Sequence, residues 1–276
     1  MALTISMSNF GGAARYMNRN SRALSQSFAR ISSGKRITSA ADDAAGIGVA
    51  SNLDAKARSV KQGIRNANDG ISIIQTAEGA YQETQNIFQR MRELAVQSSS
   101  DTLASTERAY VQDEYASLSS EIERIANVTE FNGINLTDGS TGGTLSVQVG
   151  PDSDSNNRID ITLGNLNASF TLSARNPAST VSTAADARAT TTIIDSAIDE
   201  LNGYRSDLGS AQNRMDYAIN AAEVYAENLT AAQSRIEDLD YAHESAQMAK
   251  QQIIQQAGIA VMMQMRQMDK SILSLL

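Results

Sequence analysis

The sequence predicts a mainly α-helical protein, in which both ends of the chain form a long antiparallel coiled coil or helical bundle, with a small β-hairpin segment in the middle. Three observations predict this fold. Apolar or small residues recur every three or four positions from Ile194 to Leu239, a spacing typical of a helix that wraps around a partner. A similar seam runs through the N-terminal part of the chain, and the two prolines, Pro151 and Pro177, both lie in the middle.

Composition excludes several classes of function. The chain has 276 residues, a net charge of −8, a single histidine and no cysteine. No disulfide or thiolate metal site can form, and the acidic balance argues against binding to nucleic acid. The sequence holds no nucleotide-binding loop and no histidine–carboxylate cluster. We therefore expect no enzyme activity, no cofactor and no metal.

Two signals bear on the cellular location. No apolar run is long enough to span a bilayer, so we expect no contact with a membrane. The N-terminus lacks a basic start followed by an apolar run, which is how a cleavable secretory signal begins. We expect a protein that either stays in the cytoplasm or is exported by a route that needs no such signal.

The N-terminal segment reads as one helix that ends near Gly34, a plausible C-cap. The first 41 residues of the chain include six basic residues and no acidic one. This composition is also typical of an organelle transit peptide or a nucleic-acid-binding arm. The regular seam favours a coiled-coil helix instead. The seam residues proposed for assembly are Leu3, Met7, Phe10, Met17, Leu24, Phe28 and Ile31.

A second helix is predicted to open with a capping box at Ser39–Asp42 and to run to about residue 98. Asn68-Asp69-Gly70 alone would suggest a hairpin turn, but the seam keeps its register there, so we expect the helix to continue. Asp42 and Asp43 could hold a cation, although capping is the simpler role. The seam of this second helix includes Leu53, Val60, Ile64, Ile71 and Ile74.

Polar residues occupy three later seam positions of this helix, Glu78, Gln85 and Arg92. They indicate either exposure or a change of packing partner. A third amphipathic helix is predicted over 104–127. These helices can bury their seams against the long helix of the C-terminal half in an antiparallel bundle.

The middle of the chain changes character. Residues 145–149 and 159–163 alternate apolar and polar side chains, and a third run begins at Phe170 and Leu172. We expect short β-strands here, separated by Gly-, Pro- and Asn-containing turns. The segment is too small for a core of its own and must lean on the bundle.

The C-terminal half reads as a helix that continues beyond Leu239 with a shifted seam. Its bundle seam includes Leu201, Leu208, Met215, Leu229 and Ile236. Its terminal seam, proposed for assembly, includes Ile254, Val261, Met265, Met268, Ile272 and Leu275. The two termini should pair, with basic residues of the start near Glu237, Asp238, Asp240 and Glu244.

The paired termini are not expected to be stable alone. Ordering the backbone costs about 1–2 kcal/mol per residue. A seam with one apolar side chain about every 3.5 residues returns roughly 0.4–0.9 kcal/mol per residue. Helix hydrogen bonds narrow this gap without closing it. We therefore expect the termini to be disordered in the monomer and to fold when several copies pack side by side.

Many stretches, in both flanks of the chain and in the same order, resemble the sequence signatures of bacterial flagellins. The N-terminal ones are Ile31–Ile37, Ser39–Gly46, Asn66–Ser72, Gln75–Gly79, Gln89–Gln97 and Thr129–Gly133. The C-terminal ones are Glu227–Asp238 and Ser274–Leu276. The opening, Leu3–Ser8, departs from the usual Ile-Asn-x-Asn run of the family.

The resemblance implies a subunit that self-polymerises into the bacterial flagellar filament for motility. It implies an inner coiled-coil domain (1–43 with 236–276), a helical bundle (44–139 with 186–235) and a short outward-facing β-rich segment (140–185). It also implies an extracellular location on the flagellum, type III export without a cleavable signal, and a homopolymer as the main partner. Further implied partners are an export chaperone at the C-terminal region, the filament cap and the hook-junction proteins.

Within the family, one bundle surface serves lateral packing and is also read by vertebrate Toll-like receptor five. The matching residues here are Gln89, Arg90, Glu93, Leu94 and Glu114. Phe88 and Met91 depart from the commoner aliphatic pattern. We expect lateral contact between subunits to be the main role of this surface.

Three other functions compete with a filament subunit. An enzyme would have to use His243, which reads more simply as a polar helix residue. A hook–filament junction protein shares the terminal helices of the family, but the motifs up to residue 97 favour the filament subunit. A soluble coiled-coil adaptor would form closed oligomers, which electron microscopy distinguishes from long tubes.

Overall fold

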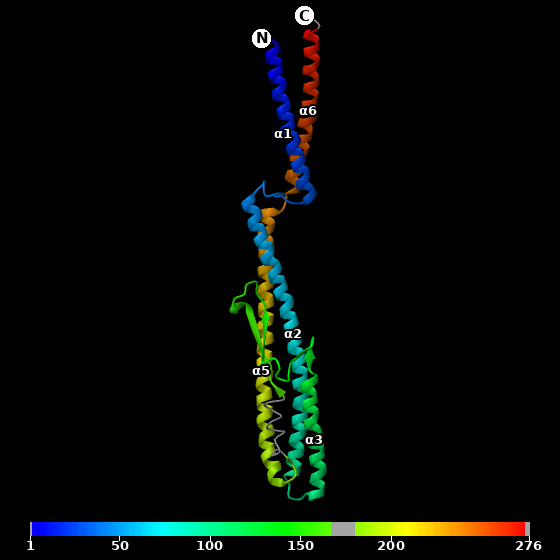
Figure 1. The fold of residues 1–276 in the computed structure, drawn as a ribbon, viewed down its shortest axis with the longest axis vertical. Helices are drawn as coiled ribbons and strands as arrows, with labels where there is room; N and C mark the ends of the chain where they lie inside the picture. The colour runs from blue at the N-terminus through cyan, green and yellow to red at the C-terminus, as the bar shows by residue number, and fades with distance from the viewer. Residues whose placement is uncertain (1, 167–179, 274–276) are drawn as a thin grey trace. The chain divides into compact units, whose positions relative to one another are not determined.

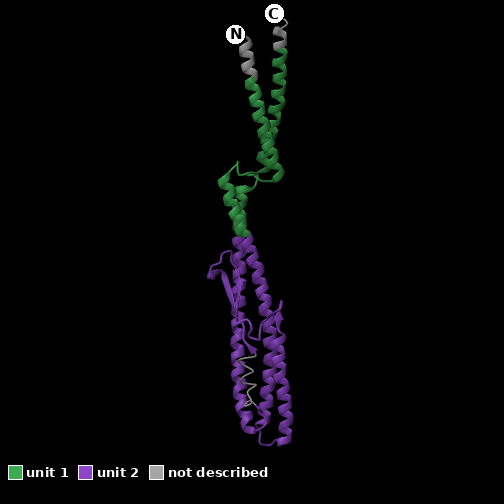
Figure 2. Ribbon diagram, in the orientation of Figure 1, with its two compact units in different colours: residues 1–57, 227–276 green, residues 58–226 purple. Residues whose placement is uncertain are grey.

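The structure, a computed structural model, describes residues 2–166 and 180–273, and the side chains of 11–166 and 180–268 among them. The chain consists of two compact units, residues 1–57 with 227–276 and residues 58–226 (Figure 2). We call these the terminal unit and the bundle unit. The elements in chain order (Figure 1) are α1 Ala2–Ser33, α2 Ala44–Ser98, α3 Ser105–Val128, β1 Glu130–Phe131, β2 Ile134–Asn135, β3 Thr144–Gln148, η1 Ser155–Asn157, β4 Arg158–Thr162, α5 Ala184–Glu237 and α6 Tyr241–Leu273.

The terminal unit pairs α1 with α6, as predicted (Figure 1). Helix α1 ends at Gly34, whose φ of +72° is favourable for glycine,. The Gly34 N–H donates to the carbonyl of Arg30 at 2.8 Å. The prediction of a glycine C-cap at this position is therefore confirmed.

The start of α2 differs from the prediction. Ser39–Asp42 forms a turn and not the capping box of the helix, because Asp42 Oδ2 accepts hydrogen bonds from the Thr38 and Ser39 N–H groups, each at 3.2 Å. The helix begins at Ala44, and Asp43 Oδ1 accepts from the Gly46 N–H at 2.8 Å. Asp43 is thus the N-cap, while hydrogen bonds from Thr38 lower the pKa of Asp42,.

Helix α2 continues through Asn68–Gly70, so the helical reading is confirmed and the hairpin reading is wrong. The reason is packing within the bundle unit. A Cβ at Gly70 would lie 2.9 Å from Met215 Sδ of α5, and a Cβ at Gly63 would lie 2.3 Å from the carbonyl oxygen of Val149. The glycines therefore permit close approach, which outweighs their poor helix propensity.

The core of the bundle unit lies between α2, α3, α5 and the β3–β4 hairpin. Its largest fully buried side chains are Tyr81, Tyr115, Phe88, Ile74, Met91, Leu94, Ile122, Leu136, Ile161, Leu166 and Ile194. The three polar residues in the seam of α2, Glu78, Gln85 and Arg92, form hydrogen bonds with side chains of α5. Arg205 donates to Glu78 Oε1 at 2.8 Å and also to Gln85, and Arg92 donates to Asp195 Oδ1 at 2.6 Å.

The predicted β-strands are present and lean on the bundle. β3 and β4 pair antiparallel, from Thr144 opposite Thr162 to Gln148 opposite Arg158. Their inward side chains, Val147, Ile159 and Ile161, join the core. The third run at Phe170 and Leu172 lies outside the described residues. β1 and β2 form a further short hairpin, whose turn residues Asn132 and Gly133 have φ values of 51° and 77°,.

A buried tyrosine ties the segment after β4 to α2. The Tyr81 hydroxyl donates to the Gly164 carbonyl at 3.1 Å and accepts from the Gly164 N–H at 2.6 Å. Burial raises the pKa of Tyr81 to about 12, so the hydroxyl stays protonated and can play both parts.

The predicted continuous C-terminal helix is wrong. α5 ends at Glu237 and α6 begins at Tyr241. Asp240 Oδ1 accepts from the N–H groups of Ala242 and His243 at 2.9 and 3.1 Å, which caps the new helix,. The shift of the apolar seam that the sequence shows is therefore a break in the helix.

Candidate assembly surface

The terminal unit has two helical breaks, one between α1 and α2 and one between α5 and α6. Residues at each break cap the helix that ends at the other. The Arg36 guanidinium donates to the Ile236 carbonyl at the end of α5, at 2.7 and 3.2 Å. The Tyr241 hydroxyl donates to the Ile31 carbonyl near the end of α1 at 3.1 Å. The last carbonyls of a helix have no partner within it, so each break here supplies what the other lacks.

Backbone pairing and charge reinforce this contact. The Arg36 N–H donates to the Glu237 carbonyl at 2.6 Å, and the Leu239 N–H donates to the Gly34 carbonyl at 3.1 Å. Lys35 forms an ion pair with Glu237, and Arg30 lies 3.9 Å from Glu244. The predicted approach of basic residues to the C-terminal acids is confirmed for these two pairs. The hydrogen bond from Lys35 lowers the pKa of Glu237.

The side chains proposed for the inner core of the assembly divide into three groups. Half-buried are Met17, Leu24, Ile31 and Met265. Exposed are Phe28, Ile254, Val261 and Met268, with Phe28 66% accessible. The side chains of Leu3, Met7, Phe10 and Ile272, and the whole of Leu275, lie outside the described residues.

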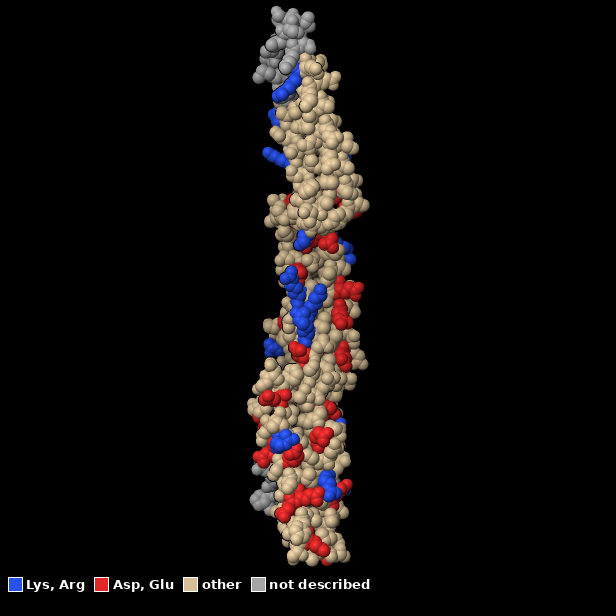
Figure 3. All heavy atoms as spheres, turned by 90° about the vertical axis from the view of Figure 1, so that its right-hand side faces the viewer, with Lys and Arg blue, Asp and Glu red and all other residues tan. Residues whose placement is uncertain are grey.

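Further apolar side chains of α6 are exposed beside the proposed seam. Ile253 and Met263 are 66% and 65% accessible, and Ile259 is also exposed. On the face drawn in Figure 3, the part that belongs to α1 and α6 is mostly without charged side chains. Several exposed large apolar side chains on one helix are typical of a contact site,. The signal for it in the sequence was the second apolar stripe beside the first.

One contact between α1 and α6 is unusually close. A Cβ at Gly258 of α6 would lie 2.3 Å from Met17 Sδ of α1. Nearby, Asn20 Nδ2 of α1 donates to the Gln251 carbonyl of α6 at 2.9 Å. The pair is therefore held by specific contacts as well as by its seam.

A pocket of about 360 Å³ lies between α1 and α6 and is lined by Ser27, Arg30, His243 and Glu244 among others. It is large enough for several waters. Arg30 Nε and Gln251 Oε1 are buried without a hydrogen-bond partner among the described residues. Within those residues, no group of three or more His, Cys, Asp or Glu side chains could hold a metal ion.

The proposed bundle seam is buried or half-buried. Buried are Val60, Ile74, Leu201, Leu208, Met215 and Leu229. Half-buried are Leu53, Ile64, Ile71 and Ile236.

The structure brings together most of the surface proposed for lateral contact. Arg90 donates to Glu114 Oε1 at 3.0 and 2.8 Å and to Glu93 Oε2 at 2.9 Å. These ion pairs raise the pKa of Arg90, and the hydrogen bonds that Arg90 donates to Glu114 contribute most. Gln89 is exposed beside them, whereas Leu94 is 1% accessible and lies in the bundle core. Leu94 can therefore support this surface but not contact a partner.

Phe88 and Met91, which depart from the family pattern, are also fully buried in the core. Their substitution therefore alters packing within the bundle unit and leaves the exposed charges in place. The sequence could not show this, because both residues flank exposed ones on the same helix.

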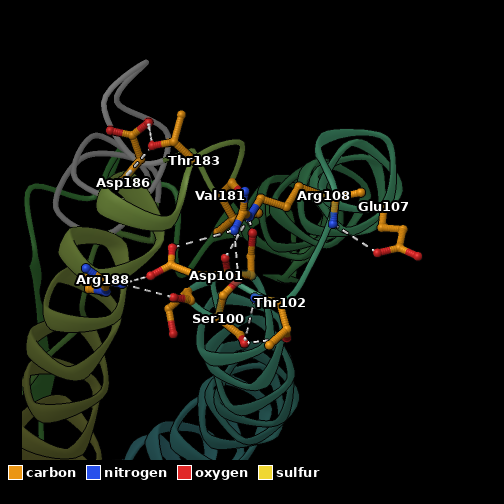
Figure 4. Close-up of polar contacts among 12 residues, drawn as sticks. Ser100, Asp101, Thr102, Glu107, Arg108, Val181, Thr183, Asp186 and Arg188 are labelled. Atoms are coloured by element: carbon orange, nitrogen blue, oxygen red, sulfur yellow. Dashed lines mark hydrogen bonds and ion pairs between the residues drawn. The ribbon is translucent and has the colours of Figure 1, made fainter.

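A polar cluster that the sequence did not reveal closes the far end of α2 (Figure 4). Arg108 of α3 donates to the carbonyls of Ser98 and Ser100 at 3.1 and 2.7 Å. Arg188 of α5 donates to Asp101 Oδ2 at 3.3 Å and to the Ser99 carbonyl at 3.3 Å. The Arg108 side chain lies at the C-terminal end of α2. Its position satisfies the last carbonyls of α2, where a cation is favoured.

Fold and surface together define a class of protein: a helical structural subunit whose terminal helices leave apolar surface uncovered. The comparisons with known proteins point to one family. The family model for the bacterial flagellin N-terminal helical region matches residues 8–141, and that for the C-terminal helical region matches residues 191–276. A flagellin of Halalkalibacterium halodurans is 39% identical over 96% of this chain and 96% of its own. The chain belongs to the bacterial flagellin family, and it is a structural subunit of the flagellar filament.

Solved structures agree with this assignment. The crystal structure of Bacillus cereus flagellin is similar with a TM-score of 0.50 and 28% identity, covering 57% of this chain and 88% of that one. A Vibrio parahaemolyticus protein described as hook-associated has a TM-score of 0.56, covering 71% of this chain and 100% of that one. At 16% identity it shows a shared fold alone. Nothing in the comparisons favours the hook–filament junction alternative.

Flagellin relatives build their filament outside the cell. In the part of the chain that the structure describes, no helix has the length and apolar character needed to cross a membrane.

Proposed function

We propose that the α1–α6 pair of each copy packs against the same pair of neighbouring copies and forms the innermost layer of the filament. The observation that carries this proposal is the exposed apolar surface of the pair, above all Phe28, Ile253 and Met263. Burying a large apolar side chain contributes about 1.5–3 kcal/mol. Burial of these side chains between copies would therefore help to order helices that are marginal alone.

In this proposal residues 1–43 with 236–276 form the inner domain, 44–139 with 186–235 form the next shell, and 140–185 face outward. The buried seam of the bundle unit supports a shell that is folded before assembly. The ends would be disordered in the monomer and ordered in the filament. The chain has a structural role in this proposal, and we propose no catalytic one.

We also propose that the chain leaves the cell through the flagellar type III apparatus, with a chaperone on its C-terminal region. The uncovered apolar side chains of α6 support this, because such a surface needs protection before assembly,. Filament cap and hook-junction proteins would contact the ends of the assembled polymer. A pull-down with residues 241–276 as bait that recovers no export chaperone from the native cell would reject the chaperone proposal.

Four exposed polar side chains are proposed to serve lateral contact first and recognition by Toll-like receptor five second: Gln89, Arg90, Glu93 and Glu114. The fixed arrangement of Arg90 between two carboxylates supports a preformed recognition surface,. Purified monomer should activate a receptor reporter, and Arg90→Ala should weaken the response. A reporter that does not respond to the wild-type monomer would reject this role.

Deletion of residues 254–276 tests the assembly proposal directly. We expect a folded bundle unit, with helical circular dichroism and a cooperative transition, that no longer polymerises. Electron microscopy of concentrated protein gives the readout, and full-length protein is the control. Normal filaments formed by the truncated chain would contradict the assignment of the terminal helices.

A further inference from the structure

A second uncovered surface lies on the bundle unit, in a groove between α2 and α3. The groove has a volume of about 600 Å³ and reaches the start of β1. Its apolar lining comes from Ala80, Ile87, Ile125 and Val128, and Val128 is 56% accessible. Gly79 adds to the opening, because a Cβ there would have no neighbour within 4 Å.

The rim of this groove is acidic. Glu83, Glu121 and Glu130 line it, against a single basic residue, Arg124. Arg124 is already engaged, since it donates to both oxygens of Glu121 at 2.6 and 2.9 Å. Glu83 and Glu130 are exposed and give the rim a net negative charge. An apolar floor with an acidic rim suits a long basic side chain, whose methylenes lie on the floor while its charge reaches the rim.

The chain itself carries a surface of matching chemistry at the start of α2. Lys56, Arg58, Lys61 and Arg65 are all exposed, and no acidic residue lies between Asp54 and Asp69. Positions 58, 61 and 65 are three and four residues apart, so they share one face of the helix. The face drawn in Figure 3 includes a group of basic side chains, with acidic side chains beside it.

We propose that the groove between α2 and α3 receives the basic face around Lys61 and Arg65 of a second copy of this chain. This inference rests on the proposed function, because it concerns a contact between copies within the filament. Charge complementarity favours this partner. The groove and the basic face around Lys61 and Arg65 both belong to the bundle unit, which favours this face over the basic stretch of α1. Long-range attraction between these surfaces would also speed docking at low salt.

Cross-linking can test the contact, since the natural chain has no cysteine. Glu83→Cys and Lys61→Cys proteins are mixed, polymerised, and treated with a bismaleimide whose spacer is longer than a disulfide bridge. We expect at least about fivefold more cross-linked dimer than in filaments of Glu83→Cys mixed with the control Ser210→Cys. Equal yields in the two mixtures would overturn the inference.

A charge exchange distinguishes the partner. Glu83→Lys with Glu130→Lys should raise the protein concentration needed for polymerisation about tenfold, and adding Lys61→Glu with Arg65→Glu to the same chain should reverse most of this. Rescue by Arg15→Glu with Arg19→Glu instead would assign the groove to α1 and overturn the inference. Circular dichroism checks that every variant is folded.

Different results would reject the proposed function and this inference. Wild-type protein that forms no filament under any condition would reject the proposed function and this inference with it. Wild-type filaments without the specific cross-link or the rescue would reject this inference alone.

Discussion

Two phenylalanines show how the two units differ. Phe88 of the bundle unit has no accessible surface, whereas Phe28 of the terminal unit is 66% accessible. Both lie on long helices with regular apolar seams, so the seams alone do not separate them. The bundle unit surrounds its seam with α3, α5 and the β3–β4 hairpin, while the terminal unit pairs α1 with α6 and leaves one side open. The difference supports the proposal that the bundle unit folds by itself and that the terminal unit is completed by further copies.

The largest expected effect concerns protection from amide exchange. In dilute monomer, amides in α1 and α6 should exchange at least about a hundredfold faster than those in the core of α2 and α5, because local stability follows buried apolar contact. Hydrogen exchange with mass spectrometry measures this, and filaments serve as the control in which the difference shrinks. Equal protection of both units in the monomer would remove the basis of the comparison.

Truncation of the two phenylalanines sharpens the comparison. Phe88→Ala should lower the free energy of unfolding of the bundle unit by about 3–5 kcal/mol, since it empties a closed core. Phe28→Ala should change monomer stability by less than about 0.5 kcal/mol.

The Phe28→Ala protein should nevertheless need about tenfold more protein to polymerise, if burial between copies is lost. Denaturant titration gives the first quantity, and light scattering gives the second. A strong loss of monomer stability in Phe28→Ala would mean that its side chain is already packed in the free chain.

The smallest expected effect is a pH dependence of the contact between the helical breaks. The pKa of Glu237 is lowered by Lys35, so its ionised form stabilises the folded contact. Such stabilisation is present above the ordinary glutamate pKa of 4.5 and is lost as the pH falls through the lower folded value,.

In filaments, the protection of residues 34–36 from exchange, measured against the intrinsic rate at each pH, should therefore fall more steeply with acid in wild-type protein than in Glu237→Gln. Glu223→Gln, an exposed position on the same helix as Glu237, is the matched control and should behave as wild type. Identical acid profiles for all three proteins would show that the ion pair with Lys35 contributes nothing measurable.

Helix identity was open to prediction because it depends on local periodicity and on local caps. The seam through Asn68–Gly70 outweighed a strong turn signal, and Gly34 ended its helix as expected. Most of the family motifs lie in helices, so membership of the flagellin family was also predictable. The strands at 145–149 and 159–163 followed from alternation of side chains.

Only the tertiary structure decided which neighbour each side chain meets. The resemblance placed Leu94 on a contact surface, but its side chain is buried, and Arg108 of α3 proves to cap α2. The sequence ran the C-terminal helix through Asp238, where the chain instead pairs with Lys35, far away in the sequence. Periodicity fixes which residues share a face of a helix, whereas burial and capping depend on which other helix arrives at that face.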